Sequence, residues 1–290
     1  MWKDLLSDSK RFWRNLSISA NSKYILACEA NGCIYLSNDS GVSFVKLFDD
    51  DKRKWSVVSM NSTGQYMVAC VSLEYVYTSS DYGVTWSMNN AVPYDRESWT
   101  DCAMSSSGEI QVLVCFDKIF TSYNYGSSWT LTMRKGAYKN ITMSEDGKYI
   151  SICGGGDAIT SNDSGKTWST LPLPSGINWR DVSMNASGQF QSICQYNGPV
   201  YTTNDYGKTW QSNNQTIRSY NICSSSKGDK LILSEFDGVT TPGSIWISSD
   251  YGKTFVKDTT SQIIRWQKIC YNDNIIVGLY TNGYIKMKQL

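Results

Sequence analysis

The sequence has no histidine among its 290 residues and only five prolines. Without histidine, Ser-His-Asp and Cys-His catalysis, imidazole-ligated metals and a histidine-based pH switch are all excluded. The scarcity of proline and the lack of a low-complexity tail argue against long disordered segments. No apolar run approaches the roughly 20 residues of a spanning helix. The charges in residues 1–6 interrupt the apolar run that a signal peptide needs. We therefore expect no membrane association.

Charge of either sign is also sparse: 27 Lys and Arg face 26 Asp and Glu, which leaves a net charge of +1. This balance gives no reason to expect nucleic-acid binding. Nine cysteines cannot all pair, so we expect free thiols and a cytoplasmic location. Cys28 and Cys33 flank one expected hairpin and are the pair most able to approach each other. We expect no metal and no cofactor.

An eight-residue signature, S/T-x-D-x-G-x-S/T-W/F, recurs six times at intervals of about 42 residues. Its third positions are Asp39, Asp81, Asn124, Asp163, Asp205 and Asp250. The signature closely resembles the Asp-box, or BNR, repeat of β-propellers. In a tight turn, Asp accepts backbone N–H bonds, Gly takes a positive φ and the hydroxyls bond the local backbone. We interpret the six boxes as structural turns, and Asn124 fits this because Asn makes a similar turn without a carboxylate.

An aromatic residue precedes each box by about 26 positions and opens a second repeated element. These residues are Trp13, Trp55, Trp99, Tyr138, Trp179 and Tyr220, and Trp266 opens a seventh unit without a box. Each unit has the pattern of four short strands with turn residues between them. In the fifth unit we place the strands at 179–184, 189–194, 200–203 and 209–212.

The seventh unit stops at Leu290, where its third strand should be. Trp2 precedes Trp13 by the same spacing that separates Phe44 from Trp55, so residues 1–6 can supply the missing fourth strand. The sequence thus predicts an all-β fold. It is a seven-bladed β-propeller of four-stranded antiparallel blades, one domain over 1–290, whose ring is closed by the N-terminal strand pairing with the C-terminal blade.

The opening aromatics should stand near the upper mouth of the central channel, and cations directly follow several of them. They could form a rim that stacks a sugar or holds an acidic peptide, or they could wedge between neighbouring blades. The candidate binding rim comprises Trp13, Arg14, Trp55, Trp99, Tyr138, Lys139, Trp179, Arg180, Tyr220 and Trp266. Irregular connections at 45–54, 87–98 and 235–244 should also lie on the upper face.

The Asp-box resemblance extends to sialidases and to photosystem II assembly-factor propellers. Sialidases also carry an arginine triad, an Arg-Ile-Pro motif and a Tyr/Glu nucleophile pair, and no such set is recognisable here. Asp101 and Asp181 share one strand position and look like a repeated polar slot rather than an acid–base pair. We therefore expect a non-enzymatic, monomeric interaction scaffold that binds a protein partner through its upper face and channel mouth. The alternative is a carbohydrate-binding protein or a glycoside hydrolase of sialidase-like type.

Overall fold

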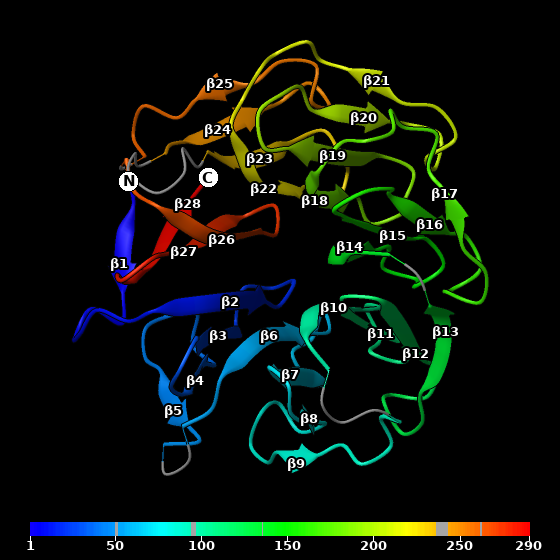
Figure 1. The fold of residues 1–290 in the computed structure, drawn as a ribbon. Helices are drawn as coiled ribbons and strands as arrows, with labels where there is room; N and C mark the ends of the chain where they lie inside the picture. Colours follow the sequence, from blue (N-terminus) through cyan, green and yellow to red (C-terminus); the bar gives the residue numbers. More distant parts are fainter. Residues whose placement is uncertain (50–51, 94–96, 135, 236–242, 262) are drawn as a thin grey trace.

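Alternating apolar residues and short turns fold each repeat into a four-stranded antiparallel sheet. The computed structural model describes residues 1–49, 52–93, 97–134, 136–235, 243–261 and 263–290, and in these residues seven such sheets form a ring (Figure 1). The strand that opens each repeat, at 13–18, 55–60, 99–104, 138–143, 179–184, 219–224 or 266–271, lies toward the centre of the ring in Figure 1. The predicted seven-bladed propeller is confirmed.

The strands of the first four blades follow the chain in simple meander order. Blade 1 contains β2 (Trp13–Ile18), β3 (Ile25–Glu29), β4 (Ile34–Ser37) and β5 (Val45–Leu47). Blade 2 contains β6 (Trp55–Met60), β7 (Met67–Val71), β8 (Val76–Ser79) and β9 (Ser87–Met88). Blade 3 contains β10 (Trp99–Met104), β11 (Gln111–Cys115), β12 (Lys118–Ser122) and β13 (Thr130–Arg134). Blade 4 contains β14 (Tyr138–Met143), β15 (Ile150–Gly154), β16 (Ile159–Ser161) and β17 (Ser169–Thr170).

Blades 5 and 6 repeat this order, and blade 7 combines both ends of the chain. Blade 5 contains β18 (Trp179–Met184), β19 (Gln191–Gln195), β20 (Tyr201–Thr203) and β21 (Gln211–Ser212). Blade 6 contains β22 (Ser219–Ser224), β23 (Leu231–Glu235), β24 (Ile245–Ser248) and β25 (Val256–Lys257). Blade 7 contains β26 (Trp266–Tyr271), β27 (Ile275–Tyr280), β28 (Ile285–Gln289) and β1 (Lys3–Leu5).

The core lies between the blades rather than inside one of them. One cluster, for example, joins Leu26 and Ile34 of blade 1 to Trp55, Val58 and Met67 of blade 2. Burial of such side chains against the neighbouring sheet is what holds adjacent blades together. Within the described ranges, no helix is long and apolar enough to cross a membrane.

The ring closes where β1 pairs antiparallel with β28, with Lys3 opposite Met287 and Leu5 opposite Ile285. Leu5 is buried in the core between blades 7 and 1. The two chain ends accordingly lie side by side in Figure 1. The closure predicted from the spacing of the tryptophans is confirmed.

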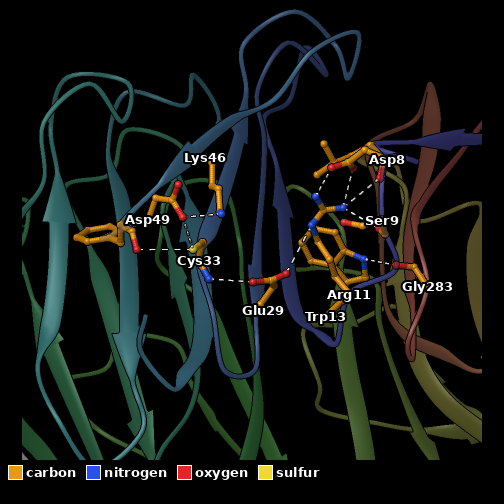
Figure 2. A network of polar contacts seen from close by, with 11 residues as sticks. Asp8, Ser9, Arg11, Trp13, Glu29, Cys33, Lys46, Asp49 and Gly283 are labelled. Carbon is orange, nitrogen blue, oxygen red and sulfur yellow. Dashed lines mark hydrogen bonds and ion pairs between the residues drawn. The ribbon is translucent and has the colours of Figure 1, made fainter. Parts of the chain in front are cut away.

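Arg11 fastens the connection between β1 and β2 to both flanking blades (Figure 2). Its guanidinium donates to both carboxylate oxygens of Asp8, at 2.9 and 2.7 Å, and to the Ser9 carbonyl at 2.7 Å. It also forms an ion pair at 3.5 Å with Glu29 of β3. The Arg11 backbone exchanges two hydrogen bonds with Gly283, just before β28. Arg11 is only 8% exposed and Asp8 is 62% exposed, so these bonds form a partly buried set of contacts, the Arg11 clasp, at the seam of the ring.

The Asp boxes are turns between the third and fourth strands of their blades, as predicted. In the fifth box, Asp205 accepts hydrogen bonds from the Thr203 hydroxyl at 2.7 Å, the Thr209 amide at 2.9 Å and the Thr209 hydroxyl at 2.6 Å. Gly207 has a φ of 85°, which glycine adopts without strain. These bonds lower the pKa of Asp205 to about 2, although partial burial opposes the shift.

The cysteines are free thiols, and Cys28 and Cys33 do not pair. Cys28, Cys70, Cys153 and Cys194 occupy one position in the second strand of their blades. In blade 3 this position holds Val114, which stands opposite Asp101, and Cys115 lies one residue beyond it.

Candidate functional site

A cavity of about 500 Å³ opens on the axis of the ring, and we call it the mouth cavity. Its wall contains the starts of inner strands, connections between blades such as Lys54 and Ser98, and turns between second and third strands such as Asn31 and Ser72. These segments define the upper face. The Asp boxes connect third to fourth strands and therefore lie at the opposite, lower end of the blades.

A bulge at the start of each inner strand points one side chain into this cavity. In blade 1, Trp13 pairs with Glu29 but Asn15 pairs with Cys28, so Arg14 is the extra residue. The same register shift occurs in the other six described inner strands. The bulge residues are Arg14, Ser56, Thr100, Lys139, Arg180, Tyr220 and Gln267, and all of them line the mouth cavity.

The aromatic residues that open the blades pack between blades instead of projecting into the cavity. Trp13, Trp55, Trp99, Tyr138, Trp179 and Trp266 are each at most 3% exposed. The indole N–H of Trp13 donates to Gly283 of blade 7 at 2.9 Å, and that of Trp55 donates to Gly32 of blade 1 at 3.1 Å. Only Trp55 and Trp99 of this set reach the cavity wall.

Tyr220 is the exception in the predicted rim, and its equivalence to the tryptophans is wrong. The residue that pairs at the tryptophan position of blade 6 is Ser219, opposite Glu235. Tyr220 is the bulge residue, which is why its partly exposed ring lines the cavity. The spacing from the core residue Ile222 reveals this register. Its equivalents Leu16 and Val182 lie three positions after Trp13 and Trp179, whereas the residue three positions before Ile222 is Ser219.

Two carboxylates, those of Asp101 and Asp181, directly follow bulge residues in the sequence, and both accept hydrogen bonds from backbone amides. Asp101 accepts hydrogen bonds from the amides of Cys102, at 3.0 Å, and of Ile141 in the next blade, at 3.1 Å. Asp181 accepts equivalent bonds from Val182 and from Ile222 in the next blade, both at 3.0 Å. Each carboxylate therefore joins its blade to the following one, as expected for a repeated polar slot.

Lys268 occupies the same layer in blade 7 and forms part of the cavity wall. Burial raises the pKa values of Asp101 and Asp181, and the positive charge of Lys268 partly opposes this. Burial also disfavours the Lys268 ammonium, but the two carboxylates more than offset this and raise its pKa. Lys268 is therefore a permanent cation in the cavity wall.

Positively charged side chains line the mouth cavity. Its cationic side chains come from several blades and are Arg14, Lys54, Lys139, Arg180 and Lys268. The Arg180 guanidinium lies over the Tyr220 ring, 4.6 Å from its centroid, and the Lys139 ammonium donates to the Asn178 side chain at 3.3 Å. Within the described part of the chain, neither Asp nor Glu lines the cavity and none of these cations forms an ion pair.

A second cluster of potential ligands, Glu97, Cys115 and Asp117, lies in blade 3 and its connection. The Lys118 ammonium bonds Glu97 at 2.8 Å and Asp117 at 3.1 Å. Because the Lys118 ammonium already bonds both carboxylates, we do not assign a metal site to this cluster.

Sequence reasoning identified three cations of the cavity, namely Arg14, Lys139 and Arg180, and missed Lys54 and Lys268. Their positions in the sequence could have identified them, since Lys54 directly precedes Trp55 and Lys268 directly follows the bulge residue Gln267. The irregular upper-face connections are described only in part, because residues 50–51, 94–96 and 236–242 lie outside the described residues.

Comparison with known proteins gives one family match. A family model of the BNR-Asp box repeat matches residues 245–259, which include the sixth box. No curated protein sequence is significantly similar to the chain.

Solved structures show the same fold at low sequence identity. The structure of YCF48 bound to D1 peptide is 13% identical, with a TM-score of 0.75, and the match covers 100% of this chain and 96% of that one. YCF48 from Cyanidioschyzon merolae gives the same identity and TM-score over 99% and 98% of the two chains.

The GH74 xyloglucanase from Xanthomonas campestris is also 13% identical with a TM-score of 0.75, but 98% of this chain spans only 53% of the enzyme. The repeat match and the shared fold agree with the ring of blades described above. The chain is a seven-bladed β-propeller, and its sixth Asp box matches the BNR-Asp box repeat.

Proposed function

We propose that this propeller is a non-catalytic interaction scaffold that binds a protein partner at the mouth cavity and the surrounding upper face. The observation that carries the proposal is the mouth cavity itself, where side chains from blades all around the ring converge on about 500 Å³ of space. A cavity of this size can accept several side chains of a partner. We include in the proposal a monomer in a reducing compartment such as the cytoplasm, which the free thiols support.

The chemistry of the cavity favours binding over glycoside hydrolysis. A hydrolase needs two carboxyl groups that face the scissile bond, about 5 to 10 Å apart. Asp101 and Asp181 are instead 7% and 4% exposed, and each is bonded to two backbone amides. A carboxylate that holds two blades together cannot turn toward a substrate without breaking those bonds.

The structural neighbours support the proposal only through the fold, because their identity to this chain is 13%. One of them, YCF48, is described as bound to a D1 peptide, so a propeller of this shape can hold a peptide. Another is a xyloglucanase, and this keeps carbohydrate binding as the alternative to be tested.

Affinity capture with matched variants tests the proposal. The mouth variant carries Arg14→Gln, Lys139→Gln and Arg180→Gln, whereas the control carries Lys166→Gln, Lys208→Gln and Lys253→Gln in exposed positions of the Asp boxes. Both variants lose three positive charges. We expect the wild type and the control to retain a protein that the mouth variant loses.

Equal capture by all three proteins would contradict the proposal. A glycan array and a panel of fluorogenic glycosides test the alternative. Turnover that disappears in Asp101→Asn or Asp181→Asn would show that the protein is a glycoside hydrolase, and selective glycan binding that the mouth variant loses would show that it is a carbohydrate-binding protein.

A further inference from the structure

Lys139, Arg180 and Lys268 are half-buried at the mouth cavity, whereas Arg14 and Lys54 are exposed there. The half-buried cations of the cavity differ from most other buried or half-buried cations of the molecule. Elsewhere such a cation has a carboxylate partner: Lys286 pairs with Asp4, Lys288 pairs with Asp258 at 2.7 Å, and Arg11 pairs with Asp8. Among the described residues, Arg14, Lys54, Lys139, Arg180 and Lys268 have no such partner, although they share one cavity. Because no carboxylate of the described residues forms an ion pair with these side chains, the cavity favours the binding of negative charge.

The positions of the cations also indicate that one small anion would not contact all of them. Arg14 comes from blade 1, Lys139 from blade 4, Arg180 from blade 5 and Lys268 from blade 7. The cations therefore surround the axis instead of converging on one point. A ligand that meets several of them must carry several negative charges spaced along its length.

Resting on the proposed function, we propose that the mouth cavity selects a peptide segment with clustered Glu and Asp side chains. Three features of the wall match such a segment. The Arg180 guanidinium lies over the Tyr220 ring, 4.6 Å from its centroid, and its N–H groups can bond a carboxylate in a bidentate way. Amide and hydroxyl side chains such as Asn31 and Ser72 line the same cavity and can bond a peptide backbone.

The third feature is Lys268 in the cavity wall, a cation whose pKa is raised by Asp101 and Asp181 of the same layer. Those carboxylates are bonded to amides of the protein and do not compete for the lysine as hydrogen-bonding partners. The small net charge of +1 argues against a nucleic acid, which requires an extended basic surface.

Fluorescence anisotropy with defined peptides tests this inference. The probe is a fluorescein-labelled dodecapeptide of alternating Gly and Glu, and its match has Gln in place of every Glu. We expect the Glu peptide to bind the wild type at least about tenfold more tightly than the Gln peptide. The mouth variant R14Q/K139Q/R180Q should lose about tenfold in affinity for the Glu peptide, while the lower-face variant K166Q/K208Q/K253Q should stay within about twofold of the wild type. The affinity should also fall with added salt.

Equal binding of the two peptides, or equal weakening by both triple variants, would overturn the inference. So would binding of inositol hexakisphosphate at the mouth cavity without binding of the Glu peptide, because the site would then be one for a small polyanion. A different result would contradict the proposed function, namely capture of the same proteins by the mouth variant and the wild type. If the mouth variant loses a partner but the Glu peptide does not bind, only the acidic-peptide inference is contradicted.

Discussion

At the scale of single residues, the Asp box shows how one carboxylate organises a turn. In the fifth box, the oxygens of Asp205 accept hydrogen bonds from two hydroxyls and one backbone amide. Equivalent bonds give the described boxes a similar turn conformation. The third box replaces the carboxylate with Asn124. There the side-chain oxygen accepts the Ser128 amide at 2.9 Å, and the side-chain nitrogen donates to the Ser128 hydroxyl at 2.9 Å. The geometry therefore survives the loss of the charge.

This comparison predicts the effect of two substitutions at Asp205. Asp205→Ala removes all three acceptor contacts and should lower the free energy of unfolding by about 1 to 2 kcal/mol. Asp205→Asn should cost less than half of that, because Asn124 makes the same turn. Urea denaturation at pH 7 measures both. Equal losses in the two variants would mean that the charge, and not the hydrogen-bond geometry, stabilises the box.

The residue scale is also where prediction from sequence was weakest. The boxes and the cations after Trp13, Tyr138 and Trp179 were recognisable because their residue types repeat. The placement of Tyr220 was wrong because an aromatic residue follows Ser219 directly, and a one-residue bulge cannot be seen from residue type alone. Only the spacing from the buried Ile222 resolves the register.

At the scale of elements, the closing strand β1 is short but makes contacts of several kinds. It pairs with β28, it buries Leu5, and Asp4 pairs with Lys286, which is only 3% exposed. The Trp2 ring lies 4.9 Å from the Trp266 ring. The sequence predicted this strand because a nearly constant number of residues separates the aromatic residue that ends an Asp box from the one that opens the next repeat. It did not predict the Arg11 clasp, since the spacing of the repeats places strands and does not indicate which side chains of a connection bond one another.

We expect deletion of residues 1–9 to destabilise the protein strongly. The deletion leaves β28 as an unpaired edge and leaves the buried Lys286 ammonium without its carboxylate. A loss of roughly 5 kcal/mol, or about 10 °C in Tm, follows from the apolar burial and hydrogen bonds that are removed. A synthetic peptide of residues 1–9 should restore part of the loss.

The matched control for this deletion is Lys3→Ala, which changes an exposed side chain of the same strand and should leave Tm almost unchanged. Unchanged melting of the truncated protein would contradict the role of β1 as the closing strand. Both proteins can be compared by circular dichroism in the same buffer.

At the scale of the whole molecule, two sets of carboxylates respond to pH with opposite signs. Hydrogen bonds to Ser43 hold the pKa of Asp39 at about 2, and the box contacts of Asp205 likewise give it a pKa of about 2. These groups stabilise the fold above their unfolded value of 3.8, and the contribution is lost as the pH falls toward 2. Asp101 and Asp181 have raised pKa values, so acidification toward 3.8 relieves their buried charge and favours folding.

The pH profile of stability should therefore have two parts. Between pH 7 and about 4 we expect little loss, because protonation of Asp101 and Asp181 acts in the stabilising direction. Between about 4 and 2 the urea midpoint should fall steeply as the boxes become protonated. Denaturation curves at half-unit pH intervals measure this. A steady loss that begins near pH 6 would show that the boxes do not dominate the acid response.

The seam formed by β1 and β28 has a consequence for how this protein is made in the cell. Within this propeller, β1 is synthesised before every other described strand and its partner β28 after them, since Lys3 pairs with Met287. Blades 1 to 6 can each assemble from neighbouring segments during synthesis, but blade 7 must wait until Ile285 has emerged. For that whole interval the blades form an open arc with an exposed edge, so a ribosome that stalls before β28 has emerged should release a species prone to aggregation rather than a closed ring.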